Sequence, residues 1–236
     1  MYNILLVKVG TTLPSLVSKK GDFEDWILSG MGIGRDSAVI VDVCNGLPLP
    51  DYKTISGVVI QGSHVMVTEH HNWSERTAEW LRGAVQRSIP VLGICYGHQL
   101  LAYALGGEVG DNPKGREYGT VEIHLSEEGR KNTLFNGFRT PFSAQVSHDQ
   151  SVLKLPNGAK KLAWSEGDEN QAFVFNDTVW GVQFHPEFDK EIVMAYINYK
   201  REALLNEGKY PDELISQCKD TSSGKLILSR FAELVN

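Results

Sequence analysis

Short apolar runs, separated by polar and turn-rich segments, divide the chain into a succession of strands and helices. The runs at residues 2–9, 37–43, 55–60 and 91–94 are short and rich in valine, isoleucine and leucine, which is typical of buried strands. Amphipathic stretches with apolar residues at helical spacing follow several of these runs. This alternation predicts an α/β fold built on a mostly parallel sheet.

The expected helices lie between these strands. One begins at Asp22, an N-cap candidate, a second covers residues 73–88, and a third runs over residues 98–105 to a Gly-Gly stop. Residues 11–21 are polar and basic, and we expect them to form an exposed loop.

The second half of the chain has a different pattern, with further strands followed by C-terminal helices. Residues 141–146 and 172–175 have the pattern of further strands, and residues 120–124 alternate in the way that is typical of an edge strand. The last fifty residues are amphipathic, with one long helix expected at 189–207 and a final one at 225–235.

Length and composition favour a single globular unit. The chain has 236 residues, of which 42% are hydrophobic and 22% charged, an ordinary composition that can fill a core. We expect residues 1–236 to form one domain, with residues 188–236 as a C-terminal helical extension packed on it. The net charge is 23 − 29 = −6, which argues against nucleic acid or an anionic membrane as the main partner.

The cysteine content and the hydropathy indicate the cellular compartment. Cys44, Cys95 and Cys218 form neither a CxxC pair nor an even disulfide set. The N-terminal apolar run is too short for a signal peptide, and no stretch approaches the ~20 apolar residues of a membrane span. We therefore expect a cytoplasmic protein.

Residues 90–99, PVLGICYGHQ, carry the strongest chemical signal. An apolar run passes through a G-x-C-x-G turn into a helix, which is the form of a nucleophile elbow with cysteine in place of serine. Gly93 and Gly97 allow the strand and the helix to approach closely around Cys95. The helix start directs its N–H groups at the sulfur and favours the thiolate, and the N–H of Tyr96 is placed to meet an oxyanion. A buried structural cysteine is the alternative that the two glycines make unlikely.

A second motif supplies a base. Residues 179–187, VWGVQFHPE, read as a short strand ending in His185, then Pro186 and Glu187. The proline fixes the backbone between the imidazole and the carboxylate, so that Glu187 can hold His185 in one tautomer.

Together the motifs GICYGHQ and GVQFHPE resemble those of the class I glutamine amidotransferases, the Cys-His-Glu glutaminase domains of GMP synthase, carbamoyl phosphate synthetase and their relatives. The similarity runs over residues 58–187 and is greatest to stand-alone, GMP-synthase-like members. It implies a three-layer αβα, flavodoxin-like fold with a mostly parallel central sheet and a small antiparallel sheet. It also implies a catalytic triad of Cys95, His185 and Glu187, with no cofactor and no metal.

The resemblance implies further site residues. Gly62, after the third expected strand, falls where the family has the second oxyanion donor beside Tyr96. Gln99 matches the family's contact to the glutamine amino-acid end. Ser147 and His148 match the family's Ser-His-Gly-Asp segment, whose backbone helps to hold the same end of the substrate.

The chain departs from the family pattern near that segment. Asp149 stands in place of the glycine and Gln150 in place of the aspartate, and His64 occupies a position where relatives often have proline. Substrate choice could have changed at these positions.

Two weaker groupings have ordinary alternatives. Four residues on one loop could be imagined as metal ligands: His64, Glu69, His70 and His71. They lack the ligand spacing of known metal sites, so we expect a solvated loop there instead. Lys114 and Arg116, after the elbow helix, could meet a substrate carboxylate or belong to an ordinary surface loop.

These residues predict hydrolysis of the γ-carboxamide of glutamine through a γ-glutamyl thioester on Cys95, with ammonia released for a separate acceptor. The sequence carries no SGGxDS-like loop and no P-loop, so we expect a separate synthase subunit to activate any acceptor. A free-standing hydrolase of γ-glutamyl peptides or amides would use the same triad. A non-catalytic regulatory or binding module is the least favoured alternative. The partner in either enzyme is a small molecule, not nucleic acid or membrane.

Overall fold

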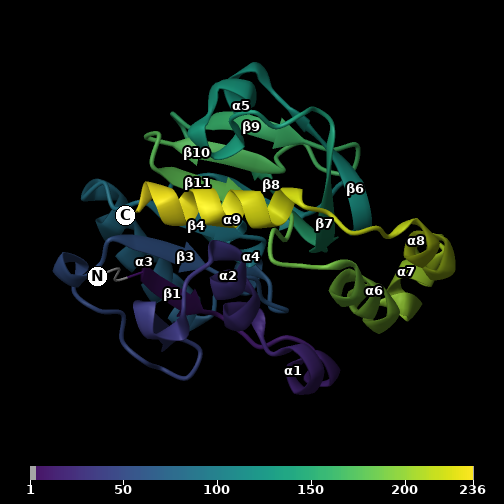
Figure 1. The fold of residues 1–236 in the computed structure, drawn as a ribbon, viewed down its shortest axis with the longest axis horizontal. Helices are drawn as coiled ribbons and strands as arrows, with labels where there is room; N and C mark the ends of the chain where they lie inside the picture. Colours follow the sequence, from purple (N-terminus) through teal and green to yellow (C-terminus); the bar gives the residue numbers. More distant parts are fainter. Residues whose placement is uncertain (1–3, 236) are drawn as a thin grey trace.

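A nine-stranded sheet organises the computed structural model, which describes residues 4–235 (Figure 1). Across the sheet the strands are β2 (Ala38–Asp42), β1 (Ile4–Lys8), β3 (Gly57–Ile60), β4 (Val91–Ile94), β11 (Val179–Val182), β10 (Ala172–Phe175), β9 (Lys160–Trp164), β6 (Glu117–Leu125) and β7 (Phe142–His148). Neighbours pair in parallel from β2 to β11 and antiparallel from β11 to β7. A separate antiparallel pair joins β5 (Glu108–Asp111) to β8 (Gln150–Lys154). The start of the first expected strand, residues 2–3, lies outside the described residues.

Helices cover both faces of the parallel part. Alternate residues of a strand point to opposite faces, so Ile4 and Leu6 pack with α2 (Phe23–Met31) and α9 (Ser223–Leu234). Leu5 and Val7 pack on the other side, in the cluster that contains the apolar residues of the two helices behind the sheet in Figure 1, α3 (Asn72–Gln86) and α4 (Tyr96–Ala104). The predicted three-layer αβα fold with a small antiparallel sheet is confirmed.

Two local expectations were wrong. The expected loop at residues 11–21 contains a helix, α1 (Pro14–Lys20), with Pro14 in its first turn and Leu16 buried. Its stability comes from tertiary packing of that leucine rather than from a periodic pattern. The alternating stretch within β6 is not an edge strand, because β6 is paired with β9 on one side and β7 on the other.

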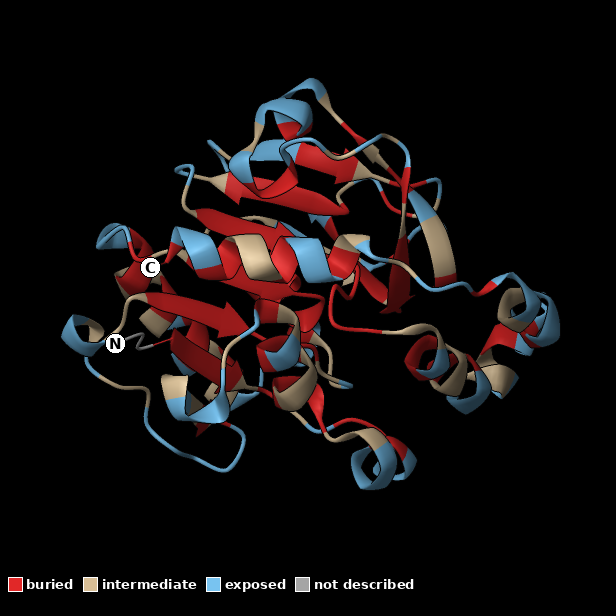
Figure 2. Cartoon of the chain, in the orientation of Figure 1, coloured by how far each residue is buried: buried red, intermediate tan, exposed pale blue. Residues whose placement is uncertain are grey.

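The C-terminal helices lie beside the sheet before the chain returns to it. The expected helix at 189–207 is divided at Lys200 into α6 (Lys190–Tyr199) and α7 (Arg201–Asn206), and α8 (Pro211–Gln217) follows. Figure 2 shows these helices exposed on their outer sides and buried where they face the sheet. Beyond them, α9 crosses the sheet and contributes buried apolar residues to the same core as β1 and β4. The division into a domain and a helical extension remains a prediction.

The remaining elements are short. They are one helix and four 3₁₀ turns: α5 (Glu127–Lys131), η1 (Arg35–Ser37), η2 (Tyr52–Thr54), η3 (Val67–Glu69) and η4 (Thr133–Phe135).

The parallel strands bring the candidate residues to one edge. Gly62 follows β3 by two residues, Cys95 follows β4 directly, and His185 follows β11 by three. These three strands are neighbours in the order β3-β4-β11. Because carboxyl ends of parallel strands open at the same edge, the residues meet there.

Candidate active site

Cys95 occupies a strained turn between β4 and α4. Its backbone angles are φ 49° and ψ −100°, a conformation that non-glycine residues rarely adopt. A Cβ on Gly93 would overlap the carbonyl of Gly97, and a Cβ on Gly97 would overlap the carbonyl of Ile60. Both glycines are therefore needed for the close approach of strand and helix, as the G-x-C-x-G motif predicts.

The first residue of α4 is held in place by a contact with α3. The Tyr96 hydroxyl is 2.6 Å from the Ser74 hydroxyl on α3, and the tyrosine is 1% exposed. First-turn N–H groups of a helix have no partner within the helix, so the N–H of Tyr96 is free of intrahelical bonding beside the sulfur. Gly62 lies on the other side of the site, where an added Cβ would come within 2.9 Å of His185 Cε1.

His185 and Glu187 form a buried pair. Their Nδ1 and Oε1 atoms are 2.8 Å apart, and the two side chains are 3% and 0% exposed. The imidazole stacks on Phe188 at 3.9 Å between ring centroids, with the planes 13° apart. With Nδ1 held by Glu187, Nε2 is the nitrogen left to face Cys95, which lines the same cavity.

Electrostatics favour a charged imidazole at this position. Burial by itself lowers the pKa of His185, but the charges of Glu187 and Cys95 and hydrogen bonds to both outweigh it. The net effect raises the pKa of His185 to about 10. The pair is thus suited to hold a proton next to the sulfur.

Gln99 lies one helical turn after Cys95 and lines the cavity. Its Nε2 donates to the carbonyl of Gln150 at 2.7 Å and to Gln183 Oε1 at 2.9 Å. Both amide protons are therefore used within the protein. A contact with a substrate would fall to the amide oxygen, which accepts hydrogen bonds and so suits an ammonium group.

Ser147 and His148 line the cavity from the end of β7. The Cys95 sulfur is 3.8 Å from the Ser147 carbonyl, and both residues line the cavity. The imidazole of His148 is hydrogen bonded to Gln150 and Glu117 instead of facing a ligand. Any substrate contact from His148 would therefore come from its backbone.

Asp149, which replaces the family's glycine, is the centre of an ion-pair cluster at the rim. Its carboxylate is 3.0 Å from Lys200 Nζ, 3.2 Å from Arg116 Nε and 2.8 Å from the Tyr118 hydroxyl. Burial raises the pKa of Asp149, but these partners outweigh it and hold that pKa below its usual value. Arg116 also pairs with Glu207, so the cluster joins the segment that contains Asp149 to α6 and α7.

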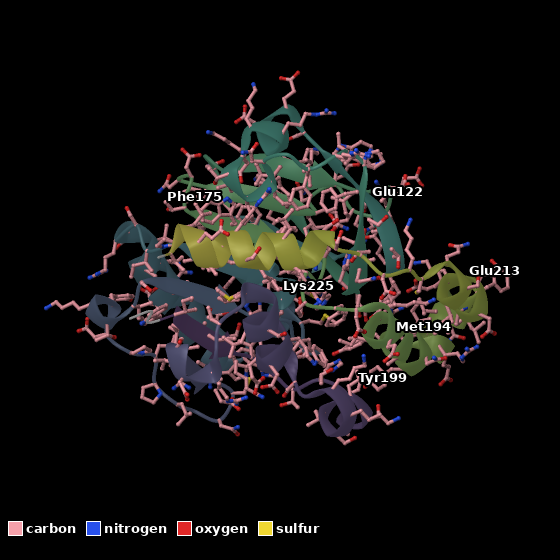
Figure 3. All side chains as sticks on the ribbon, in the orientation of Figure 1. Glu122, Phe175, Met194, Tyr199, Glu213 and Lys225 are labelled. Carbon is pink, nitrogen blue, oxygen red and sulfur yellow. The ribbon has the colours of Figure 1, made fainter. Side chains whose placement is uncertain are left out.

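His64 faces the same cavity from the loop after β3. Its ring stacks on Tyr196 at 5.4 Å and meets Tyr199 edge-on at 5.7 Å. Tyr199, labelled at the end of α6 in Figure 3, is 61% exposed. Sequence reasoning missed Tyr199 and Lys200, because nothing local marks a helix that ends 135 residues after His64 as part of the rim.

The weaker groupings do not come together. His70 Nδ1 pairs with Glu75 and His71 Nε2 with Glu69, each at 2.8 Å, whereas His64 points into the cavity. Among residues 4–235, no group of three or more histidine, cysteine or acidic side chains is placed to hold a metal ion.

Lys114 does not face the site. It bonds to the Glu166 carbonyl and to Glu169. Of the two basic residues suggested for a substrate carboxylate, Arg116 is near the cavity but is paired with acidic groups.

Comparison with known proteins defines the class. A family model described as glutamine amidotransferase class-I matches residues 44–195. The chain belongs to this family. Among relatives, one subunit of the glutamine-hydrolyzing GMP synthase of Ignicoccus hospitalis is 38% identical over 60% of this chain and 71% of its own length.

Other relatives differ in how much of their own length this chain spans. The GMP synthase of Aeropyrum pernix is 40% identical over 64% of this chain, which spans only 27% of that protein. The corresponding GMP synthase subunit from Methanocaldococcus jannaschii is 31% identical over 74% of this chain and 84% of its own length.

A solved glutamine amidotransferase from Thermotoga maritima has the same fold. It superposes with a TM-score of 0.78 at 23% identity, over 100% of this chain and 98% of that one. Within residues 4–235, none of the helices has the length and apolar character needed to cross a membrane.

Proposed function

We propose that this chain is a glutaminase that acts through a Cys95–His185–Glu187 triad. The observation that carries the proposal is the convergence of a strained, glycine-flanked cysteine and a buried His–Glu pair on one cavity. Family membership supports the same reaction class.

In the first half-reaction, the Cys95 thiolate attacks the γ-carbonyl carbon of glutamine, and the carbonyl electron pair moves to oxygen. The N–H groups of Gly62 and Tyr96 stabilise this oxyanion. His185 gives its Nε2 proton to the leaving nitrogen, the C–N bond breaks, and ammonia departs. The product on the enzyme is a γ-glutamyl thioester.

In the second half-reaction, neutral His185 removes a proton from water as the water oxygen attacks the thioester carbon. The C–S bond then breaks, which releases glutamate and restores the thiolate–imidazolium pair. Glu187 keeps the ring oriented throughout and stabilises its positive charge.

For the fate of ammonia, we propose a separate synthase subunit. The relatives from Ignicoccus and Methanocaldococcus are described as single subunits of a GMP synthase, which supports a partner chain. Ammonia released without a partner would be wasted, so we expect slow glutamine hydrolysis by the isolated chain and faster hydrolysis in its complex.

A free-standing γ-glutamyl peptide or amide hydrolase is the second candidate. The observation that favours it is the charged rim, where Asp149 replaces glycine and contacts Lys200 and Arg116. The rim adjoins the segment that the family uses to hold the amino-acid end of glutamine, so a change of substrate is expected to involve it. The chemistry of the triad would be unchanged.

The test is a substrate screen of the purified full chain with glutamine and a set of γ-glutamyl peptides, reading glutamate release. We expect measurable glutamine hydrolysis that Cys95→Ala abolishes and Cys44→Ala, an exposed cysteine, leaves intact. Rapid cleavage of a γ-glutamyl peptide with glutamine as a poor competitor would replace the first candidate by the second. Full activity of Cys95→Ala would overturn both.

A further inference from the structure

A second histidine–glutamate pair lies behind the active-site wall. His148, the last residue of β7, is 3% exposed. Its Nδ1 is 3.0 Å from the carbonyl of Gln150, and its Nε2 is 2.9 Å from Glu117 Oε2. A carbonyl oxygen can only accept, so Nδ1 carries a proton.

The hydrogen bonds of Glu117 determine whether the other ring nitrogen, Nε2, carries a proton. Its Oε2 is 2.6 Å from Gln171 Nε2, and its Oε1 is 2.7 Å from the Ser165 hydroxyl. That hydroxyl accepts from the Asp168 N–H and from Gln171, so its own proton is directed at Glu117. Glu117 therefore accepts on both oxygens. Burial raises the pKa of Glu117, but hydrogen bonds from His148, Ser165 and Gln171 and the charge of His148 outweigh it and hold that pKa below its usual value. Glu117 is thus a carboxylate, and Nε2 of His148 donates to it. Both ring nitrogens carry protons, and the ring is an imidazolium.

The surrounding charges agree with this assignment. Burial lowers the pKa of His148, but Glu117 on β6, Asp168 before β10 and Cys95 at the elbow together raise it to about 9. Another titratable neighbour is His98 on α4, whose own pKa burial lowers to about 3, so it adds no competing charge near neutral pH.

The pair is connected to the groups that hold substrate. The Gln150 carbonyl that accepts from His148 also accepts from Gln99 Nε2 at 2.7 Å. The preceding residue, Ser147, places its carbonyl 3.8 Å from the Cys95 sulfur. The imidazolium thus anchors the segment that contacts both the nucleophile and the glutamine-binding amide.

We propose that the His148–Glu117 ion pair is a positioning element of this site: it fixes the turn at residues 147–150, whose Ser147 carbonyl is 3.8 Å from the Cys95 sulfur and whose Gln150 carbonyl accepts from Gln99. The pair acts by holding this turn in the geometry that the reaction needs, without taking part in proton transfer. The catalytic consequence rests on the proposed function, whereas the ionisation state does not.

The ionisation state is tested by NMR of the full chain labelled with ¹⁵N-histidine. The ring of His148 is identified by the loss of its signals in His148→Asn. We expect long-range ¹H–¹⁵N correlations to show two protonated nitrogens from pH 6 to pH 8. A neutral tautomer at pH 7 would overturn the proposal, whatever the role of Cys95.

The role in catalysis is tested with Glu117→Gln. The glutamine amide can donate to Nε2 of a neutral His148, so both hydrogen bonds of the ring persist while the ion pair is lost. The hydrogen bond from Gln171 Nε2 to the same carboxylate oxygen is lost as well. We expect kcat to fall about tenfold with KM changed less than about threefold. Glu117→Asp, which retains the charge, should recover part of the loss. The matched control is Glu108→Gln, which removes the carboxylate of an exposed pair with Lys154 and should keep the wild-type kcat.

The outcomes separate the two claims. Unchanged kcat in Glu117→Gln would mean that the ion pair is not needed to position the turn and would overturn the proposal. If Glu117→Gln fails to fold, the Glu117→Asp kcat and the NMR result decide instead: a kcat as low as that of Cys95→Ala would count against positioning. Activity of Cys95→Ala would reject the proposed function and leave the imidazolium assignment standing.

Discussion

The candidate site has two buried histidine–glutamate pairs, which differ in how the histidine ring is bonded. In the pair of His185 and Glu187, one ring nitrogen is held by the carboxylate and the other is left to face the sulfur. In the pair of His148 and Glu117, both ring nitrogens are bonded to fixed acceptors within the fold. On this basis we propose that the first ring exchanges a proton and that the second does not.

The difference teaches that burial and a carboxylate partner do not by themselves make a catalytic base. A proton-transfer group must keep one nitrogen available to reactants, whereas a fixed charge gains from having none available. The following experiments sharpen or break this distinction, beginning with the largest expected effect.

The pair at His185 should be essential. Both His185→Ala and Cys95→Ser should lower kcat roughly 10³-fold or more, and the double variant should lose little beyond either single one, because the residues act as a unit. Steady-state glutamate release measures this, with His71→Ala, an exposed histidine paired to Glu69, as control. Losses that multiply in the double variant would separate the two residues.

Glu187→Gln should have a smaller effect. The variant keeps a hydrogen bond to Nδ1 but removes the charge that raises the pKa of His185. We expect a fall in kcat of roughly 10- to 10²-fold, less than for His185→Ala, because the carboxylate orients and stabilises without exchanging protons. A loss equal to that of His185→Ala would assign it a direct part in proton transfer.

The contribution of the His148–Glu117 pair to the free energy of unfolding should depend on pH. The folded-state pKa of about 9 is above the ordinary value of about 6.5, so the ion pair stabilises the fold fully below pH 6.5 and loses this contribution as the pH rises to about 9. Glu117→Gln should therefore lower the free energy of unfolding by roughly 2–3 kcal/mol at pH 6. The deficit should shrink towards pH 9.

Urea unfolding of both proteins at pH 6, 7.5 and 9 measures this difference. Comparison with the wild type cancels the similar dependence contributed by His185. A deficit that is constant over this range, or that grows, would mean that His148 is not charged.

The rim should give the smallest effect. Asp149→Gly removes the partner of Lys200 and Arg116 and restores the family's residue. We expect kcat for glutamine within about threefold of wild type and a change confined to KM, since the cluster does not touch the sulfur. Adding Gln150→Asp should move preference further towards glutamine if this segment selects the substrate. Competition between glutamine and a γ-glutamyl peptide is the measurement, and unaltered preference in the double variant would remove the segment from substrate selection.

The candidate triad could be proposed from the sequence because each motif is local. The geometry of Cys95 depends on two glycines within two residues, and that of His185 and Glu187 on a single intervening proline. Steric rules that act over such short distances can be recognised in sequence. The parallel core was predictable for a similar reason, since each buried strand carries its own apolar run.

The second pair could not be predicted, because Glu117 and His148 are 31 residues apart and meet only through the register of β6 against β7. The contact of Asp149 with Lys200 spans 51 residues and depends on how α6 packs. Helix α1 was missed because its stability is tertiary, resting on one buried leucine. In each case the deciding interaction is between segments that no local pattern relates.

The assignment of Cys95 as the nucleophile beside a proton-donating His185 is central, and mapping a covalent label tests it most directly. The full chain is treated with a glutamine-like diazoketone, digested, and analysed by mass spectrometry, with excess glutamine as competitor. We expect label on Cys95 alone, protection by glutamine, and much slower labelling in His185→Ala. Label on Cys44 or Cys218, or labelling that glutamine does not slow, would contradict the assignment.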